Sequence, residues 1–299
     1  MDSALLGRLC CPNDHGQLAL QAAPAERDGI EGQLHCRVCG GSYPIEAGIP
    51  RFLSAKQNEL CALQESEMNV RDNGYRAGSG CMDAWHAPEF DAVRAALGNC
   101  RGLSVLDAGC GVGKFSPIVK NADCFLGVDF SWEGLVRFQK PACVTGLVKG
   151  DVTRMPVQDH VFDIALCCQV LSHLPAPPLR SDLPNELARV LRPNGRLILT
   201  ALYYSFRYRR RQIPQEAEEA GSYYHRFVVS ELRDLHSERF TIRSLHGYWI
   251  YLPKTYWLFI RLGPWRAYWD RIWRNLPLSL KYGKYLWRYA RQNPDCGIV

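Results

Sequence analysis

A glycine-rich turn after an apolar run carries the most informative chemistry in this sequence. Residues 105–113 read Val-Leu-Asp-Ala-Gly-Cys-Gly-Val-Gly. The apolar start predicts a buried strand, and the glycines let the backbone approach a ligand closely where a helix is expected to begin. Because the first N–H groups of a helix have no partner within the helix, such a turn favours a carboxylate or a phosphate. The sequence therefore predicts a nucleotide-like ligand here.

The spacing of the glycines narrows the choice of ligand. A dinucleotide-binding turn needs a third glycine three residues after the second, where this chain has Lys114. A phosphate-binding P-loop needs glycine at Ala108 and Ser or Thr at Phe115. The pattern that remains, Asp-x-Gly-x-Gly-x-Gly from Asp107 to Gly113, resembles motif I of the class I S-adenosylmethionine (SAM) methyltransferases.

Further residues occur where this resemblance expects them. Asp129 ends the apolar run 124–128, and Asp151 follows Gly150 after another short apolar run. The resemblance implies that Asp129 binds the ribose hydroxyls, that Asp151 and the next backbone amide read the adenine edge, and that residues 169–174 face the methyl donor. The SAM-binding residues predicted in this way are Asp107, Ala108, Gly109, Gly111, Gly113, Asp129, Phe130, Asp151, Val152 and Gln169. Arg71 and Tyr75 are added because their segment resembles the N-terminal cap that such methyltransferases fold over the donor, and a solvated helix face is the alternative for that segment.

The elements that must position these residues follow the same resemblance over about residues 65–250. We expect strands at 124–128 and 163–168, a helix capped by Ser131, and a fifth strand after the turn Pro193-Asn194-Gly195. The predicted fold is α/β, a Rossmann-like class I methyltransferase fold with a seven-stranded, mostly parallel sheet. The predicted domains are a zinc-ribbon-like module (1–55), a helical cap or linker (56–100), a SAM-binding core (101–252) with a lid insert at about 203–227, and an α-helical, aromatic and basic extension (253–299).

A second group of chemistry-bearing residues lies near the N-terminus. Cys11 is followed by Cys36 and Cys39, and the last two have the spacing of a zinc knuckle. The segment resembles the small zinc-ribbon module found fused to some methyltransferases and as a free activator of others, but Asp14 replaces the second cysteine of the usual first knuckle. The fourth ligand of a structural Zn²⁺ could come from Asp14, His15 or Cys10. A ribbon that has lost its metal is the alternative.

Methyl transfer from a sulfonium demands no fixed catalytic residue beyond a base for an acceptor that carries a proton. His173 is the best-placed candidate, because it follows the strand predicted at 163–168, near the sheet edge where open α/β sheets bind ligands. His225, in the predicted lid insert, is the second candidate. A histidine at His173 could equally be a structural hydrogen-bond partner.

The segment 249–291 is unusual in composition. It holds six of the eight tryptophans and a net charge of +8, against +6 for the whole chain. Apolar residues recur there at steps of three and four, which predicts a helix with an aromatic face and arginines opposite: Trp265, Tyr268, Trp269, Ile272, Trp273 and Leu276. Such a face could dock on the chain's own core with the arginines in water, contact a membrane surface or lipid-like substrate, or stack on nucleic acid. Nucleic acid is the least favoured, because the excess charge is confined to this segment.

The sequence therefore predicts a SAM-dependent methyltransferase that acts on a small-molecule or lipid-like acceptor. An RNA methyltransferase and a SAM-binding partner protein without turnover are the alternatives. The apolar fraction of 47% suffices for a core, and most of the 13 cysteines are expected to be reduced. Residues 1–9 do not resemble a signal peptide and no long apolar run is present, so we expect a cytoplasmic protein, with peripheral membrane contact through 249–291 as an option.

Overall fold

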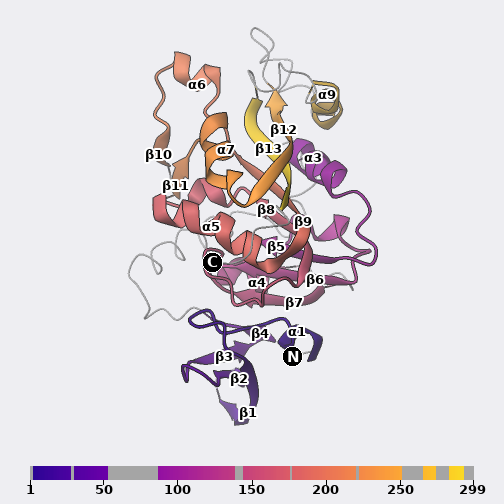
Figure 1. Cartoon of the computed structure of the whole chain (residues 1–299), viewed down its shortest axis with the longest axis vertical. Coiled ribbons are helices and arrows are strands. Elements are labelled where there is room, and N and C mark those ends of the chain that lie inside the picture. Colours follow the sequence, from indigo (N-terminus) through magenta and orange to yellow (C-terminus); the bar gives the residue numbers. More distant parts are fainter. Residues whose placement is uncertain are drawn as a thin grey trace.

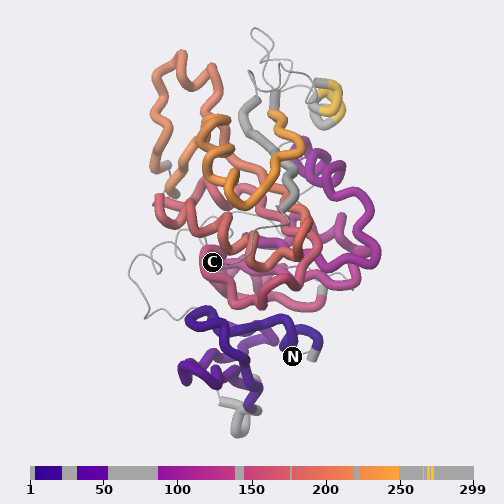
Figure 2. Tube along the Cα trace, viewed as in Figure 1, coloured from indigo at the N-terminus to yellow at the C-terminus, as the bar shows by residue number. Residues whose placement is uncertain are grey.

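The computed structural model describes residues 3–27, 30–52, 87–138, 144–175, 177–219, 222–250, 265–273 and 283–292. A large α/β layered unit forms most of the molecule, and a small β module, indigo in Figures 1 and 2, lies at one end of the long axis. Among the described helices, none combines the length and apolar character needed to cross a bilayer. The predicted SAM contacts Arg71 and Tyr75 lie outside the described residues.

The α/β unit is built on a seven-stranded sheet among the described residues, in the order β12-β13-β9-β8-β5-β6-β7. Neighbours from β7 to β9 pair in parallel, whereas β13 pairs antiparallel with both β9 and β12 and so runs against the other six strands. The predicted seven-stranded, mostly parallel sheet is confirmed. Its strands are β5 (Ser104–Ala108), β6 (Cys124–Asp129), β7 (Val144–Lys149), β8 (Phe162–Cys168), β9 (Leu191–Leu202), β12 (Phe240–Ile250) and β13 (Gly283–Gln292).

The central strands of the sheet are buried on both faces because helices cover it. All residues of β5 and β6 are buried, and successive side chains such as Val105 and Leu106 belong to two different core clusters, as expected where they alternate across a sheet. Ser131 caps the helix after β6, as predicted, since its side chain accepts from the Gly134 N–H at 3.0 Å. The covering helices are α3 (Ala87–Leu97), α4 (Trp132–Val136), α5 (Pro177–Val190) and α7 (Val229–Ser237).

The boundary predicted at residue 252 is too early. Residues 283–292 form β13, which lies between β9 and β12 and belongs to the central sheet. The extension is therefore not α-helical throughout, although the helix expected within it is present as α9 (Arg266–Trp273). The physical reason is that β9 and β12 run in the same direction, and an antiparallel strand fills the space between them.

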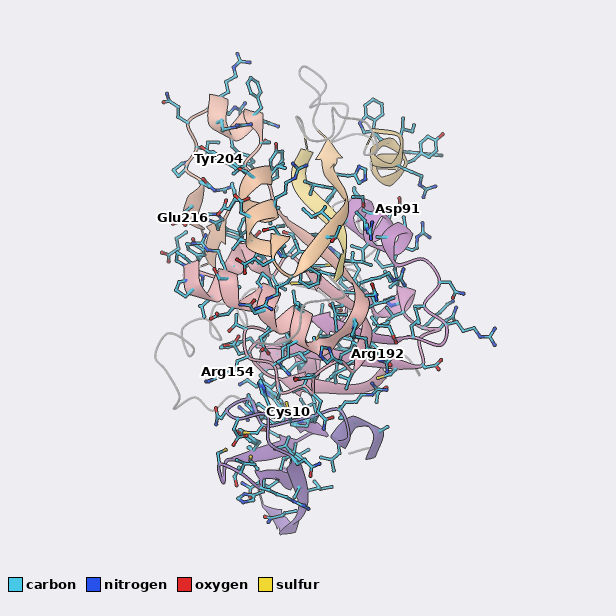
Figure 3. All side chains as sticks on the ribbon, in the orientation of Figure 1. Cys10, Asp91, Arg154, Arg192, Tyr204 and Glu216 are labelled. Carbon is cyan, nitrogen blue, oxygen red and sulfur yellow. The ribbon has the colours of Figure 1, made fainter. Side chains whose placement is uncertain are left out.

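The predicted insert leaves the sheet at Tyr203 and returns at Phe227, which pair in a short bridge. It contains helix α6 (Phe206–Arg210) and the hairpin of β10 (Glu216–Glu219) and β11 (Ser222–His225). Strand β11 packs against η2 (Leu171–His173), the turn that follows β8. The insert therefore lies beside the carboxyl end of β8, and Figure 3 shows Tyr204 and Glu216 within it.

The N-terminal module is a four-stranded sheet that packs on the outer strand of the large sheet. It consists of α1 (Ser3–Leu6), β1 (Leu18–Arg27), β2 (Ile30–Cys36), β3 (Ser42–Glu46) and β4 (Ile49–Pro50). The Phe52 N–H donates to the Lys149 carbonyl of β7 at 2.9 Å, and the Cys10 N–H donates to the Pro156 carbonyl at 3.2 Å. Buried residues of the module join the core cluster of the large sheet, so the two parts share one apolar core.

Candidate active site

The glycine-rich turn after β5 depends on glycine at specific positions. Gly109 and Gly113 have φ of +84° and +86°, in the left-handed region that favours glycine. A Cβ at Gly109 would lie 2.1 Å from the Val170 side chain, so no larger residue fits there. The backbone N–H of Gly111 donates to the Asp129 carboxylate at 2.6 Å. Motif I and Asp129, the acid that ends β6, are therefore brought together, as the sequence predicts.

Asp107, at the end of β5, is buried, and neither of its carboxylate oxygens has a hydrogen-bond partner among the described residues. Burial first, and the charge of Asp129 second, raise its pKa to about 8. A buried carboxylate is costly unless a partner satisfies it. The amino-acid end of SAM carries an ammonium group, whose donors and charge fit these two oxygens. The buried, unpartnered oxygens of Asp107 are therefore suited to bind the ammonium group of SAM.

The two other acids occupy the ends of the neighbouring strands. Asp129 accepts from the backbone N–H of Ser131 at 2.8 Å in addition to Gly111, and a carboxylate has capacity for about four such bonds. Asp151 follows β7 and accepts from the backbone and the hydroxyl of Thr153, both at 2.8 Å. The strand order places Asp107, Asp129 and Asp151 along one edge of the sheet. Ala108 and Val152 are buried beside them, and Phe130 is half-buried.

A cluster around Glu89 was not predicted. Glu89, in the first turn of α3, accepts from the Thr200 hydroxyl at 2.5 Å, the Tyr248 hydroxyl at 3.0 Å and the Gln169 side-chain amide at 3.2 Å. Its second oxygen pairs with Lys114 of the glycine-rich turn. Burial alone would raise the pKa of Glu89, but the Lys114 charge and these donors outweigh it and hold the pKa below its usual value.

The Glu89 cluster fixes a residue that the resemblance places toward the methyl donor. Gln169 directly follows β8 and has φ of +62°. Its side-chain amide also donates to the Tyr248 hydroxyl at 2.8 Å. Because Gln169 follows β8, while Thr200 and Tyr248 lie in β9 and β12, the cluster connects three strands beside the predicted SAM site.

The two candidate bases have different surroundings. The Nδ1 atom of His173 lies 3.0 Å from the Tyr223 carbonyl, which can only accept, so Nδ1 carries the proton and Nε2 is the basic nitrogen of the neutral ring. His225 lies between two carboxylates, with Nδ1 3.0 Å from Glu216 and Nε2 2.6 Å from Glu231. This position ties the insert to α7. The role of either histidine as a base stays a prediction.

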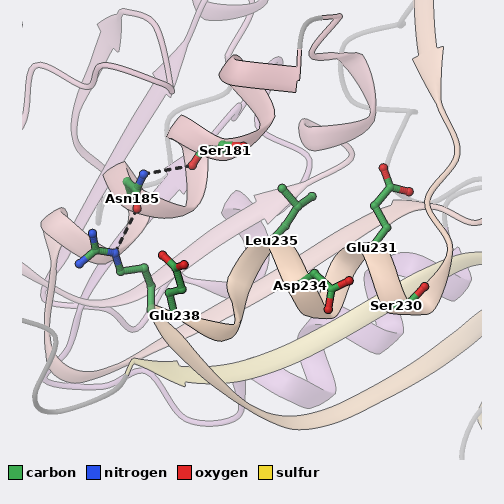
Figure 4. Close-up of a pocket in the computed structure, with 8 residues that line it drawn as sticks. Ser181, Asn185, Ser230, Glu231, Asp234, Leu235 and Glu238 are labelled. Carbon is green, nitrogen blue, oxygen red and sulfur yellow. Dashed lines mark hydrogen bonds between the residues drawn. The ribbon is translucent and has the colours of Figure 1, made fainter.

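A surface hollow of about 510 Å³ lies between α5 and α7 (Figure 4). Three carboxylates line it, from Glu231, Asp234 and Glu238, and the Arg239 guanidinium donates to the Asn185 side chain at 3.1 Å on its wall. None of its lining residues belongs to the predicted SAM-binding set. The hollow is therefore separate from the predicted ligand site.

The structure brings together Cys11, Asp14, Cys36 and Cys39 in the N-terminal module. One ligand atom from each lies within 4.8 Å of all the others. The sulfurs of Cys11 and Cys39 are 3.5 Å apart, and the Cys36 sulfur is 3.4 Å from an Asp14 oxygen. Three thiolates and one carboxylate at these separations form a donor set suited to tetrahedral Zn²⁺.

The two other candidates for the fourth ligand are not part of this group. His15 is exposed and has φ of +56°, and Cys10 is buried. Burial raises the pKa of the Cys10 thiol to about 12, which disfavours the thiolate that a metal needs. The Gly16 backbone N–H donates to Asp14 at 2.8 Å and lowers the pKa of that carboxyl to about 2.

Two protein-family models match the regions that contain the glycine-rich turn and the N-terminal module. Residues 106–199 match the model for the methyltransferase domain, and residues 2–48 match the model for Trm112p-like proteins. Residues 106–199 are a class I SAM-dependent methyltransferase domain. The domain begins in β5 and ends in β9, so it contains the glycine-rich turn, all three strand-end acids and Gln169.

Curated relatives of the methyltransferase domain have different substrates in their names. The chain is 34% identical over 188 residues to a tRNA (carboxymethyluridine(34)-5-O)-methyltransferase of Arabidopsis thaliana, with 54% of this chain and 46% of the relative covered. It is 28% identical over 172 residues to the sterol 24-C-methyltransferase erg6 of Aspergillus fumigatus, with 51% and 45% covered. The chain thus spans less than half the length of these two relatives.

A solved structure shows the same fold. The 1,6-didemethyltoxoflavin-N1-methyltransferase of Burkholderia thailandensis, determined with 1,6-didemethyltoxoflavin and S-adenosylhomocysteine, is similar with a TM-score of 0.52 and 20% identity. The similarity covers 87% of this chain and 98% of that chain. At this identity it supports the fold of the methyltransferase domain.

Proposed function

We propose that this protein transfers a methyl group from SAM to a small-molecule or lipid-like acceptor. The observation that carries the proposal is Asp107, a buried carboxylate without hydrogen-bond partners among the described residues, at the start of a glycine turn that admits no larger side chain at Gly109. Bound SAM would supply a methyl group on a sulfonium that serves as its own leaving group. Asp107 would hold the ammonium group, Asp129 the ribose hydroxyls, and Asp151 with the Val152 amide the adenine edge.

We propose that the insert, which packs against η2, selects the acceptor. The Tyr224 ring lies 5.0 Å from the His173 ring, and Tyr204 stacks on Tyr208 within the same insert. An insert rich in aromatic side chains at the carboxyl edge of the sheet suits an apolar acceptor. The names of the relatives leave both an RNA and a sterol-like substrate open, so the acceptor class is tested directly.

The first test is calorimetry of the purified chain with SAM and with S-adenosylhomocysteine. Binding is expected, and its absence in folded protein would remove the proposal. Transfer of labelled methyl groups is then measured with extracted lipids, small molecules and tRNA. Label in the lipid or small-molecule fraction supports the proposal, and label in tRNA alone assigns the RNA alternative. Binding without transfer to any fraction assigns the alternative of a SAM-binding partner protein.

His173 is proposed as the base for an acceptor that carries a proton. Its Nδ1 contact with the Tyr223 carbonyl fixes the tautomer in which Nε2 can take that proton. His173→Ala should abolish turnover while the affinity for SAM stays unchanged. Turnover equal to that of the unmodified chain would exclude this role.

The N-terminal module is proposed to hold a structural Zn²⁺ through Cys11, Asp14, Cys36 and Cys39. Elemental analysis should find one zinc per chain, and Cys36→Ser should lose it, whereas Cys10→Ser should retain it because Cys10 is outside the group. Asp14→Cys should bind zinc more tightly, since thiolate is the softer donor. Protein without zinc would instead support the metal-free ribbon.

A further inference from the structure

Two short helices share one end of the molecule. In Figure 1, α6 and α9 lie at the upper end of the long axis, and the N-terminal module lies at the opposite end. Helix α6 belongs to the insert beside the predicted active site, and α9 follows β12 in the chain. Both helices expose apolar and basic side chains together.

The exposed apolar side chains of α9 and its start lie on one face of the helix. Trp265 is 69% exposed, Tyr268 58% and Ile272 50%, and their spacing of three and four residues aligns them. Exposed side chains of this size in a row differ from the single exposed apolar residues that any protein surface carries. This row is called the α9 stripe.

A charge pair on a neighbouring helix holds α9 in this orientation. The Arg271 guanidinium donates to the Asp91 carboxylate of α3 at 2.8 and 3.3 Å, and α9 packs along α3. Asp91 lies on the part of α3 next to α9 in Figure 3. The sequence allowed an aromatic face docked on the core with arginines in water. For α9 the structure shows part of each arrangement: Trp269 of the predicted face is half-buried and Arg271, although paired with Asp91, is 53% exposed, whereas the α9 stripe is exposed.

Helix α6 presents a basic surface with an apolar side chain among the arginines. Phe206 is 45% exposed, and four arginines on α6 and its C-terminal cap are exposed: Arg207, Arg209, Arg210 and Arg211. Tyr208 points the other way, because it stacks on Tyr204 and lies 5.0 Å beneath the Arg226 guanidinium. These inward contacts set the arginines outward.

Positive charge is concentrated in the two segments that carry these helices. Residues 203–215 have a net charge of +4 with no acidic residue, and residues 249–291 have +8. Because the whole chain has only +6, the rest of the chain is net negative. The four exposed arginines of α6 and its C-terminal cap therefore complement an anionic partner presented to this end of the molecule.

We infer that α6 and the α9 stripe dock on an anionic lipid bilayer. Aromatic and aliphatic side chains flanked by arginines suit the boundary between headgroups and acyl chains, and each basic side chain adds attraction to anionic lipid. RNA is less suited, because the aromatic side chains lie on the outer face of a helix and include aliphatic Ile272, whereas single strands stack in basic grooves. The inference rests on the proposed function in one respect: binding to the bilayer would bring the insert close to a lipid-like acceptor within it.

Sedimentation of the full chain with phosphatidylcholine vesicles, with and without phosphatidylglycerol, tests this inference. We expect binding to the anionic vesicles that weakens with added salt. The double variant W265S/Y268S should reduce the affinity at least tenfold, and Arg209→Gln and Arg210→Gln about fivefold each. The matched controls Val38→Ser, which is 71% exposed on the N-terminal module, and Arg101→Gln, which is exposed before β5, should change it less than twofold.

Several results would overturn the inference. One is the absence of vesicle binding, and another is an equal loss of vesicle affinity in the control variants. A dimer that W265S/Y268S dissociates would instead assign the surface to a second copy of the chain. RNA binding that the same variants weaken, without vesicle binding, would assign the surface to RNA. Calorimetry with SAM on the same proteins separates this inference from the proposed function. Vesicle binding without SAM binding would refute only the methyltransferase proposal, and SAM binding without vesicle binding would refute only the bilayer inference.

Discussion

Asp107 and Glu89 are two buried carboxylates near the same edge of the sheet, and their surroundings are opposite. Glu89 has a lysine and three further donors within the chain, and its pKa lies below the usual value. Asp107 has no hydrogen-bond partner among the described residues, and its pKa is raised to about 8. Glu89 has its positive partner built into the fold, whereas Asp107 forms no ion pair or hydrogen bond within the part of the chain that the structure describes.

The difference indicates that Glu89 stabilises the site, whereas Asp107 is suited to bind a ligand. A buried charge that the chain itself satisfies rigidifies the site, because every member of the cluster is held by several others. A buried carboxylate that the chain leaves unsatisfied is stabilised by a cationic ligand, and its cost without the ligand is carried by the rest of the fold. Glu89 and Asp107 are therefore expected to respond differently to substitution, to pH and to SAM.

Among these tests, Glu89→Ala is expected to lower the free energy of unfolding most. It leaves Lys114 half-buried without its carboxylate, so the free energy of unfolding should fall by about 4 kcal/mol. Denaturant unfolding measures this change. Glu133→Ala is the control, because that side chain is 41% exposed and its pair with Arg137 spans 3.6 Å, so the expected loss there is under about 0.5 kcal/mol. A small loss at Glu89 would show that the cluster does not stabilise the fold.

Next in size is the pH dependence caused by Asp107. Its folded pKa of about 8 lies above the ordinary value of 3.8, so its contribution to stability is complete below the ordinary pKa and is lost as the pH rises through the folded pKa. Between pH 5.5 and pH 8 this loss amounts to about 3 kcal/mol. Asp107→Asn should lack it, so the variant should gain stability relative to the unmodified chain as the pH rises. Parallel pH profiles of the two proteins would contradict the raised pKa.

Asp107→Asn should also weaken the binding of SAM. Loss of a charge-assisted hydrogen bond costs about 2 kcal/mol, which corresponds to roughly a 30-fold higher Kd in calorimetry at pH 8. Arg101→Gln, which alters an exposed side chain before β5, serves as the control with an unchanged Kd. An unchanged Kd in Asp107→Asn would mean that the ammonium group is bound elsewhere.

The smallest effect is expected for Thr200→Val. The substitution keeps the shape of the side chain but removes the hydroxyl that donates to Glu89 at 2.5 Å, while Lys114 and Tyr248 remain. The free energy of unfolding should fall by about 1.5 kcal/mol, and the Kd for SAM should change less than threefold. A loss as large as that of Glu89→Ala would show that Thr200, rather than Lys114, satisfies the carboxylate.

The sequence predicted the glycine-rich turn and the strand-end acids because their constraints are local. A left-handed glycine such as Gly109 and a carboxylate directly after an apolar run can both be recognised within a few residues. The Glu89 cluster could not be predicted in this way. Its members come from five distant places in the chain, and only the packing of α3 against the sheet brings them together.

Strand β13 was missed for a different reason. Steps of three and four between aromatic residues in 265–276 indicated a helix, and the whole extension was assigned to it. The segment 283–292 has its own signal, because Tyr285, Trp287 and Tyr289 alternate with other residues at the period of a strand. Aromatic residues favour strands, so this alternation could have separated β13 from the helix.

The place of β13 in the sheet has a consequence for synthesis. Because β13 lies C-terminal to both strands, β9 and β12 leave the ribosome before it, so their edges that pair with β13 are open at first. Until β13 inserts, these edges can pair with other chains, which makes the nascent protein vulnerable to aggregation. A premature stop codon shortly before residue 283 would leave the same open edges permanently, even though the glycine-rich turn and its acids had already been made.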